Sequence, residues 1–375
     1  MTREELAAWL QLVQADGIGP DSARRLLAAF GLPEQILAQS RPALEQVVSS
    51  RQAEALRNPA PETLALIDTT WTWLQQPDDG LQRRVLTLGS PGYPASLLQM
   101  ADPPVLLYAL GQCDRLAASQ GIAMVGSRNP TPQGAINARQ FARAFADLGW
   151  TVISGLALGV DAAAHEGALS GFDAVVHAGP STVAVVGTGL DRVYPRQHRE
   201  LAHRIAQSGV LLSECPLGAP PLAHHFPQRN RIIAGLSHGV LVVEAAPQSG
   251  SLITARQASE QGKEVFAIPG SIHSPQSRGC HALIRQGAKL VESAEDVLEE
   301  LRPGLVRRNA ADEVACRASD DPLLDALGYD PVSLDALLAR TGLDTAALQA
   351  RLLELELDGQ VGRLPGGLFQ RMGQS

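Results

Sequence analysis

Short apolar stretches alternate with amphipathic stretches of ten or more residues through the middle of the chain. The apolar stretches predict strands at Ile122–Val125, Thr151–Ile153, Val183–Val186, Val210–Ser213, Val240–Val243, Val265–Ile268 and Lys289–Val291. The stretches between them predict helices at about 132–148, 159–169, 196–207, 228–236, 251–261, 279–286 and 294–301. Apolar strands separated by helices are typical of a parallel sheet covered on both faces. The pattern therefore predicts an α/β fold with a Rossmann-like, doubly wound, mostly parallel sheet.

The segments before this sheet predict a separate helical unit. Residues 1–66 read as short helices and indicate a small all-α N-terminal domain, followed by an extended Rossmann-like domain over 67–303. In the first unit, two amphipathic helices flank Gly17-Ile18-Gly19-Pro20, as in a helix-hairpin-helix. That loop could bring glycine amides to a DNA phosphate, or it could simply connect two helices.

The end of the chain predicts a winged helix over 321–375, joined to the sheet domain by a linker at 304–320. Helices are expected at about 322–327, 333–340 and 344–358, with a hairpin at 361–364 and 368–371. Residues 312–375 carry eleven Asp and Glu against five Arg, a net charge of −6. Because phosphate repels such a surface, we expect an interaction or regulatory role here rather than the main DNA contact.

Composition narrows the class of protein. The 375 residues are 45% apolar and carry a net charge of −8, so a large core is available and a polybasic coat is excluded. Any nucleic acid would therefore be bound in a local pocket. No apolar run reaches the roughly 18 residues of a membrane span, and the N-terminus lacks a signal-peptide pattern, so we expect a cytoplasmic protein without a membrane partner. The four cysteines form no CxxC pair, and we expect no metal site.

Small residues and one arginine follow the predicted strands, where the carboxyl edge of a parallel sheet binds ligands. The candidate phosphate-binding residues in these loops are Gly126, Ser127, Arg128, Ser154, Gly155, Gly159, Ser249, Gly250 and Ser251. Free amides at helix starts favour anions, and Arg128 would grip a phosphate beside the amides of Gly126 and Ser127. It could instead be a structural arginine paired with Asp161. The dinucleotide fingerprint and the P-loop are both absent, so no cofactor is predicted.

The segment Phe226 to Arg231 offers an aromatic ring beside polar and basic side chains. Phe226 could stack on a base while Arg229, Asn230 and Arg231 hold the backbone, or it could be a buried hydrophobic staple at the helix start. Asp161 and His165 are four residues apart and could be an acid–base pair. We favour local hydrogen bonds that fix the loop from Ser154 to Gly159. No nucleophile elbow or other catalytic constellation is visible, which predicts a protein that is not an enzyme.

Several motifs together resemble the DNA-processing protein A (DprA/Smf) family over residues 80–300. They are Gly126-Ser127-Arg128, SGLALGVDAAAHEGAL, TGLDRVYPRQHREL, FPQRNRIIAGLS, SGSLITARQASEQGKEVFAIPG and GCHALIRQGAKLV. The flanks are also similar to longer members, which carry a sterile-alpha-motif or helix-hairpin-helix-like domain and a C-terminal winged helix.

The resemblance implies a single-stranded-DNA-binding recombination mediator that protects incoming DNA and loads RecA during natural transformation. It also implies a homodimer, in which segment 279–290 faces the partner through His281, Leu283, Ile284 and Leu290. By sequence alone these could equally be ordinary core residues. Some members place a basic residue before the Phe-Pro pair, where this chain has His224 and His225; protonation of these histidines would then tighten binding.

The main alternative is an enzyme. The same sheet resembles the cytokinin-activating, LOG-like phosphoribohydrolases, whose P-G-G-x-G-T-x-x-E segment supplies a glutamate. The corresponding stretch here, Pro247 to Ala255, lacks it. Glu214 and Glu244, at strand ends, remain candidates for acid–base work. A third possibility is an adaptor whose nucleotide edge no longer binds DNA.

Overall fold

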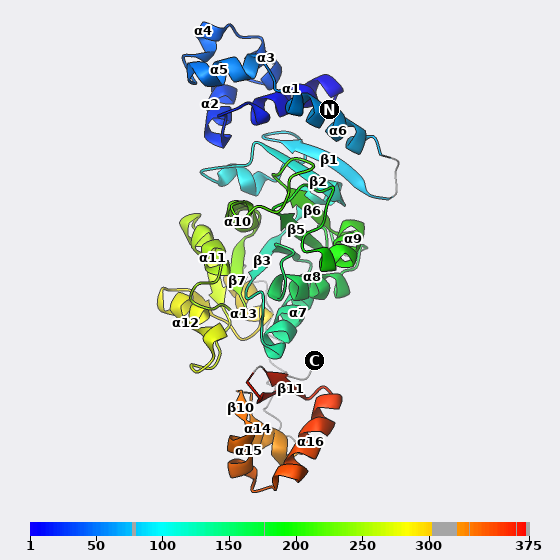
Figure 1. Cartoon of the computed structure of the whole chain (residues 1–375), viewed down its shortest axis with the longest axis vertical. Helices are drawn as coiled ribbons and strands as arrows, with labels where there is room; N and C mark the ends of the chain where they lie inside the picture. The colour runs from blue at the N-terminus through cyan, green and yellow to red at the C-terminus, as the bar shows by residue number, and fades with distance from the viewer. Residues whose placement is uncertain (77–79, 176, 302–320, 330, 365, 373–375) are drawn as a thin grey trace.

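The computed structural model describes residues 1–375 except 77–79, 176, 302–320, 330, 365 and 373–375 (Figure 1). The linker predicted at 304–320 therefore lies outside the described residues. Within the described part, no helix has both the length and the hydropathy needed to cross a membrane.

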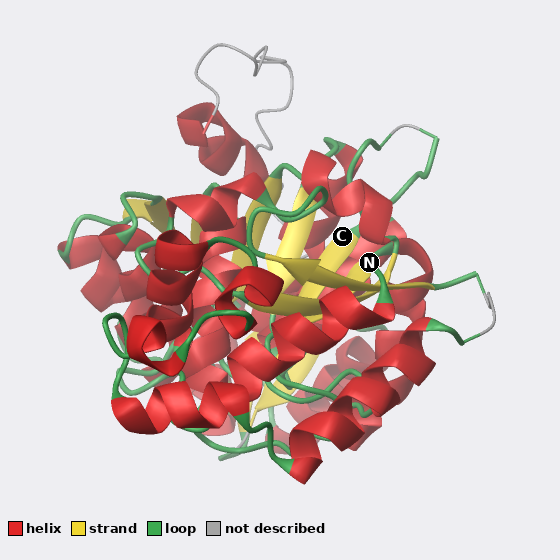
Figure 2. Cartoon of the chain, turned by 90° about the horizontal axis from the view of Figure 1, so that it is seen from above, coloured by secondary structure: helices red, strands yellow, loops and turns green. Residues whose placement is uncertain are grey.

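The centre of the molecule is one nine-stranded sheet in the order β1-β2-β6-β5-β4-β3-β7-β8-β9. Figure 2 shows strands of this sheet in yellow, surrounded by helices in red. The strands are β1 (Gln82–Thr87), β2 (Leu106–Gly111), β3 (Gly121–Val125), β4 (Thr151–Ser154), β5 (Thr182–Val186), β6 (Val210–Ser213), β7 (Gly239–Val242), β8 (Glu264–Ala267) and β9 (Lys289–Leu290). From β6 to β9 all neighbours are parallel, and β1 and β2 add an antiparallel edge. The predicted fold class is confirmed.

Helices cover both faces because successive side chains of a strand point to opposite sides. In β3, Ile122 and Met124 share a core with α7 (Pro132–Asp147), α8 (Val160–Ser170) and α13 (Ala294–Leu301). Ala123 and Val125 face the opposite core, formed with α10 (His225–Leu236), α11 (Ser251–Glu260) and α12 (Arg278–Arg285). Helix α9 (Arg199–Ser208) covers the sheet near β6.

The order of the strands reverses around β3. Strand β4 lies on one side of β3 and β7 on the other. After β3 the chain crosses to β4, whereas after β7 it crosses in the opposite direction, to β8. In open α/β sheets, such a switch point opens a crevice at the carboxyl ends of the strands. The turn that follows β3, beginning at Gly126, lies at this crevice.

Six helices form the N-terminal domain: α1 (Arg3–Gln14), α2 (Pro20–Phe30), α3 (Pro33–Leu37), α4 (Arg41–Leu44), α5 (Ser50–Arg57) and α6 (Pro61–Leu74). Helix α6 continues past residue 66, where the sequence suggested a boundary. Its Trp73 meets Tyr108 of β2 with ring centroids 6.1 Å apart. The N-terminal core is therefore continuous with the antiparallel edge of the sheet.

The C-terminal part is a winged helix with its own core. It consists of α14 (Pro322–Leu327), α15 (Leu334–Thr341), α16 (Thr345–Leu357) and a three-stranded sheet of β10 (Val332–Ser333), β12 (Leu368–Arg371) and β11 (Val361–Leu364). Leu324, Leu337, Leu348 and Phe369 are among its buried residues. The hairpin agrees with the expected strands, and β11 packs against α7.

Candidate functional site

A cavity of about 650 Å³ opens at the switch point of the sheet. It is formed by the turn after β3, the start of α10 and the turn between β7 and α11. Nine of the residues singled out from the sequence line it: Gly126, Ser127, Arg128, Phe226, Arg229, Asn230, Ser249, Gly250 and Ser251. The sheet thus brings together residues that lie more than a hundred positions apart. We call this cavity the crevice.

Glycine allows the turn after β3 to pack tightly against its neighbours. A Cβ on Gly126 would lie 2.9 Å from the carbonyl oxygen of Glu244, and Gly159 has a φ of +79°, which favours glycine. The amide of Ser127 donates to the Glu244 carbonyl at 2.7 Å. The Ser127 amide is therefore not free for a phosphate, which corrects the expectation that it would assist Arg128.

Ser154 and Gly155 belong to the wall behind the crevice and do not line it. The Ser154 hydroxyl donates to the Met124 carbonyl, and the Gly155 and Ala157 amides donate to Asp161 at 3.1 and 3.2 Å. These donors are satisfied within the protein. Ser154 and Gly155 therefore shape the loop before α8, and the expected amide contact with phosphate from Gly155 does not fit this geometry.

Asp161 and His165 fix that loop, as the sequence favoured. The Leu156 amide donates to Nε2 of His165 at 3.3 Å, and Leu156 has a φ of +58°, uncommon for a residue with a side chain. Burial, reinforced by the nearby Arg229 cation, lowers the pKa of His165 to about 3. The imidazole is therefore neutral at physiological pH, so it can accept this hydrogen bond.

Arg229 lies beneath the crevice rather than on its rim. Its side chain is buried, it donates to the Val185 carbonyl at 2.7 Å, and it lies 3.9 Å from Asp161. Gly155 leaves room for this guanidinium, since a Cβ there would lie 1.5 Å from Nη1. Burial lowers the pKa of Arg229, while the Asp161 carboxylate opposes that shift. Arg229, and not Arg128, is thus the partner of Asp161.

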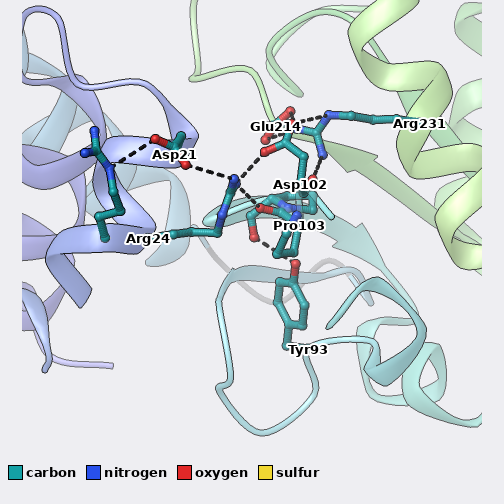
Figure 3. Close-up of polar contacts among 9 residues, drawn as sticks. Asp21, Arg24, Tyr93, Asp102, Pro103, Glu214 and Arg231 are labelled. Carbon is teal, nitrogen blue, oxygen red and sulfur yellow. Dashed lines mark hydrogen bonds and ion pairs between the residues drawn. The ribbon is translucent and has the colours of Figure 1, made fainter. Parts of the chain in front are cut away.

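Arg231 points away from the crevice toward the N-terminal domain (Figure 3). Its guanidinium forms two hydrogen bonds to Glu214, at 2.6 and 2.5 Å, and one to the Asp102 carbonyl at 2.6 Å. The Asp102 carboxylate also pairs with Arg24 of α2. Arg231 therefore belongs to an ion-pair network between domains, and the expectation of a basic rim formed by Arg229 and Arg231 is not met by their placement.

An exposed cation and two aromatic rings lie together beside the crevice, where all three line a smaller adjoining hollow. Cζ of Arg128 lies 5.8 Å from the ring centroid of Phe226, and the rings of Phe226 and Tyr194 are also 5.8 Å apart. Phe226 is the second residue of α10, half-buried, and lines hollows on both sides, so it is not enclosed as a core staple. Tyr194 is 47% exposed. Sequence reasoning missed it, although it stood as a lone aromatic in the motif TGLDRVYPRQHREL.

The opposite wall of the crevice is polar and uncharged. The hydroxyls of Ser249 and Ser251 lie 2.7 Å apart, and the Gln276 side chain donates to the Asn129 carbonyl at 3.2 Å. Asn129, Gln248 and Gln276 line the crevice but were not among the candidates. Asn129 and Gln248 lie in loops and Gln276 in a short 3-10 helix (Pro275–Ser277), without any distinguishing spacing, so no sequence signal identified them.

Glu214 and Glu244, the two candidates for acid–base catalysis if the protein were an enzyme, do not line the crevice. Glu214 is bound to Arg231, and Glu244 accepts from the amide and hydroxyl of Thr131 at 2.9 and 2.6 Å. Burial raises the pKa of Glu244. Among the described residues, no group of three or more His, Cys, Asp or Glu side chains could hold a metal. The crevice itself is suited to binding an anion beside an aromatic ring.

The segment expected at a dimer interface forms α12 and the edge strand β9. Leu290 is 45% exposed, whereas Leu283 and Ile284 are half-buried against the core. His281 interacts through Nε2 with the Gly270 carbonyl at 2.9 Å. The segment therefore combines core contacts with one prominent exposed leucine.

These features define a protein with a Rossmann-like sheet domain, flanked by a helical N-terminal domain and a C-terminal winged helix, whose crevice lies at the switch point of the sheet. The family model for DNA recombination-mediator protein A matches residues 84–302, and the model for the DprA winged helix domain matches 309–367. Protein Smf of Escherichia coli K12 is 42% identical over 310 residues, covering 80% of each chain. The DNA processing protein DprA of Streptococcus pneumoniae is 47% identical over 208 residues, covering 56% of this chain and 71% of its own.

Solved structures agree with these matches. The X-ray structure of DNA processing protein A from Streptococcus pneumoniae superposes with a TM-score of 0.67 at 35% identity, covering 80% of this chain and 99% of that one. A structure of the Helicobacter pylori protein, described by its single-stranded DNA binding mode, gives 0.51 at 30% identity, covering 58% and 95%. The chain belongs to the DNA recombination-mediator protein A (DprA/Smf) family.

Proposed function

We propose that this protein binds single-stranded DNA in the crevice and acts as a recombination mediator in natural transformation. The observation that carries the proposal is the position of Arg128 beside Phe226 and Tyr194. A single strand offers phosphates and unpaired base faces together. A cation next to aromatic rings binds both, whereas the bases of a duplex are stacked and inaccessible to the rings.

Family membership supports this assignment, and so does the Helicobacter pylori relative described by its single-stranded DNA binding mode. The net charge of −8 confines attraction for phosphate to the crevice. Arg128 is exposed there, and no described carboxylate forms an ion pair with it. A binding mode based on a few phosphate contacts and on stacking suits such a surface.

The test is a binding assay with labelled oligonucleotides at several salt concentrations. We expect binding to single-stranded oligonucleotides, weaker binding to a duplex of the same sequence, and no measurable binding of nucleoside monophosphates. Tight binding of mononucleotides would instead favour the phosphoribohydrolase. Release of free base from a nucleoside monophosphate would establish that activity and overturn the assignment as a non-enzymatic protein.

We further propose that two protomers pair through α12 and β9, placing two crevices in one particle. Leu290→Glu, at an exposed position, should give a folded monomer by light scattering, whereas Leu64→Glu, on α6 and 52% exposed, should remain a dimer. The monomer should bind long single strands more weakly, because linked sites gain effective concentration. An unaltered dimer would place the interface elsewhere.

Protection of incoming DNA and loading of RecA are the cellular steps that we propose for this complex. Wild-type protein should slow nuclease digestion of a single strand and shorten the lag of RecA ATP hydrolysis on that strand. A variant that binds DNA normally but leaves the lag unchanged would separate RecA loading from DNA binding.

A further inference from the structure

Helix α16 of the winged helix is apolar on two opposite faces. Leu348, Leu352 and Leu355 are buried in the domain core. On the other side, Ala346, Ala350, Leu353 and Leu357 follow one another at intervals of four, three and four residues, which places them on one face of a helix. We call these four residues the outer stripe. From Ala346 to Leu357 they span twelve residues, about 16 Å along the helix axis.

The outer stripe is exposed rather than packed against the sheet domain. Leu353 is 56% and Leu357 80% exposed. The winged helix meets the sheet domain through β11, which packs on α7, and through Tyr329, Pro331 and Gln370, which line a shared cavity. Figure 1 shows α16 beyond β11, at the end of the molecule opposite the N-terminal helices. A surface helix ordinarily presents polar residues on its outer face. Large apolar side chains gathered there indicate a surface that another molecule covers.

Acidic residues border the outer stripe. Glu354, Glu356 and Asp358 stand at the C-terminal end of α16, and its last turn holds no basic residue. Arg351 offsets part of this charge through pairs with Glu354 and Asp321.

This arrangement is unfavourable for an isolated helix for two reasons. The C-terminal end of a helix carries partial negative charge and favours cations. Glu354 and Asp358 are also like charges four residues apart, which repel each other. A cationic partner that covers the stripe would relieve both effects.

We infer that the outer stripe of α16 docks an amphipathic helix of another protein, one with a row of aliphatic side chains flanked by lysine or arginine. The acidic border disfavours DNA at the position where a winged helix usually reads it, because phosphate is repelled. It also disfavours a second copy of the same face, which would bring like charges together. A basic amphipathic helix matches both the apolar row and the charge. The inference does not depend on DNA binding in the crevice.

The test uses the full chain and a labelled synthetic peptide helix with four leucines at the same three intervals, flanked by lysines. A scrambled peptide of identical composition is the control. Fluorescence anisotropy should show binding of the patterned peptide at least tenfold tighter than that of the scrambled one. Equal binding of the two peptides would reduce the effect to charge alone and would overturn the inference.

Variants then locate the site. Leu353→Ser with Leu357→Ser should weaken peptide binding at least tenfold, whereas Leu64→Ser, at an exposed leucine of α6, should leave it unchanged. Glu356→Lys with Asp358→Lys should also abolish binding, and it should stabilise the helix end, so unfolding would not account for the loss. Retained peptide binding in both double variants would overturn the inference. The leucine variant gives two further outcomes that would overturn the inference. Loss of duplex DNA binding would assign the stripe to DNA, and loss of self-association would assign it to a second copy of the chain.

Discussion

Helix α10 presents two faces to two different environments. On one face, Phe226 and Asn230 line the crevice, with Arg128 close by. On the other, Gln228 and Arg231 line a cavity of about 380 Å³ at the boundary with the N-terminal domain. Arg128 is exposed beside an aromatic ring, whereas the Arg231 side chain is 13% exposed and bound to Glu214 and Asp102. Two arginines that were both expected to contact the DNA backbone therefore lie in different surroundings.

The difference lies in the carboxylates around each guanidinium. A largely buried arginine is stable only when carboxylates neutralise it, and Nη2 of Arg231 satisfies that need by contacting both carboxylate oxygens of Glu214. The charge of Arg231 is therefore neutralised within the protein, and Arg24 extends the same ion-pair network to α2 (Figure 3). Through these ion pairs the N-terminal domain contacts the face of α10 that points away from the crevice. On the crevice side, the charge of Arg128 remains available for a ligand.

The largest effect should come from the boundary face. Arg231→Ala leaves Glu214, whose side chain is 26% exposed, without its counter-charge. Removing one partner of such a pair typically costs about 3–5 kcal/mol, and we expect a loss at the lower end because the site is not fully closed to solvent. Urea denaturation measures it. Arg24→Ala should cost less, since its partner Asp102 is 48% exposed.

The same Arg231→Ala variant also tests the comparison directly. If it stays folded, its binding to single-stranded DNA should show the same salt dependence as wild type, because no phosphate contact is removed. A flatter salt dependence with unchanged stability would mean that Arg231 contacts DNA after all.

On the crevice face, Phe226→Ala should weaken single-strand binding by about 1–3 kcal/mol, the range found for base–aromatic stacking. The salt dependence should stay nearly unchanged, because stacking releases few counterions. Phe172→Ala is the matched control, since Phe172 stacks on His177 outside the crevice. Normal affinity in Phe226→Ala would show that the ring does not touch the strand.

The loop behind the crevice should respond to acid. His165 titrates near 6.5 when unfolded and has a pKa of about 3 in the folded protein, because burial disfavours its charge. Its contribution is complete above pH 6.5 and is lost as the pH falls toward 3, where the unfolded chain binds the extra proton. Between pH 7 and 5.5 this amounts to about 1.3 kcal/mol. His165→Gln should flatten the fall in stability over that window, measured by urea denaturation at each pH.

The elements that position the crevice could be predicted from sequence because their signals are local. Apolar runs predicted β6 with its observed bounds and β3 to within one residue, since β3 begins at Gly121 rather than Ile122, and α14 and the wing hairpin also agree with their patterns. Helix α10 begins earlier than expected, at His225, so Phe226 lies inside its first turn. The two-residue strand β10 was missed because two residues carry no periodicity.

Side-chain roles were harder to predict because they depend on partners distant in sequence. Arg229 contacts Val185 and Asp161. Arg231 contacts Glu214 and Asp102, which lie 17 and 129 positions before it in the chain. Tyr194 comes beside Phe226 only after the chain has folded. The Asp161 and His165 contacts were anticipated, since four and nine residues separate them from the loop amides that they accept from. Local hydrogen bonds can thus be inferred from spacing, whereas ion pairs across the sheet cannot.

The finest distinction concerns Arg128. Its structural alternative, a pair with Asp161, is taken by Arg229, so the guanidinium of Arg128 remains available at the crevice mouth. Arg128→Ala should weaken binding about equally for all sequences and reduce the slope of log affinity against log salt by roughly 0.7, the loss of one phosphate contact on a single strand. Arg143→Ala removes the same charge from an exposed site on α7 and should leave that slope unchanged. Thermal stability should hardly change, because no carboxylate loses its partner. An unchanged slope together with a lowered melting temperature would make Arg128 a structural residue, and the contrast between the two faces of α10 would then rest on the aromatic rings alone.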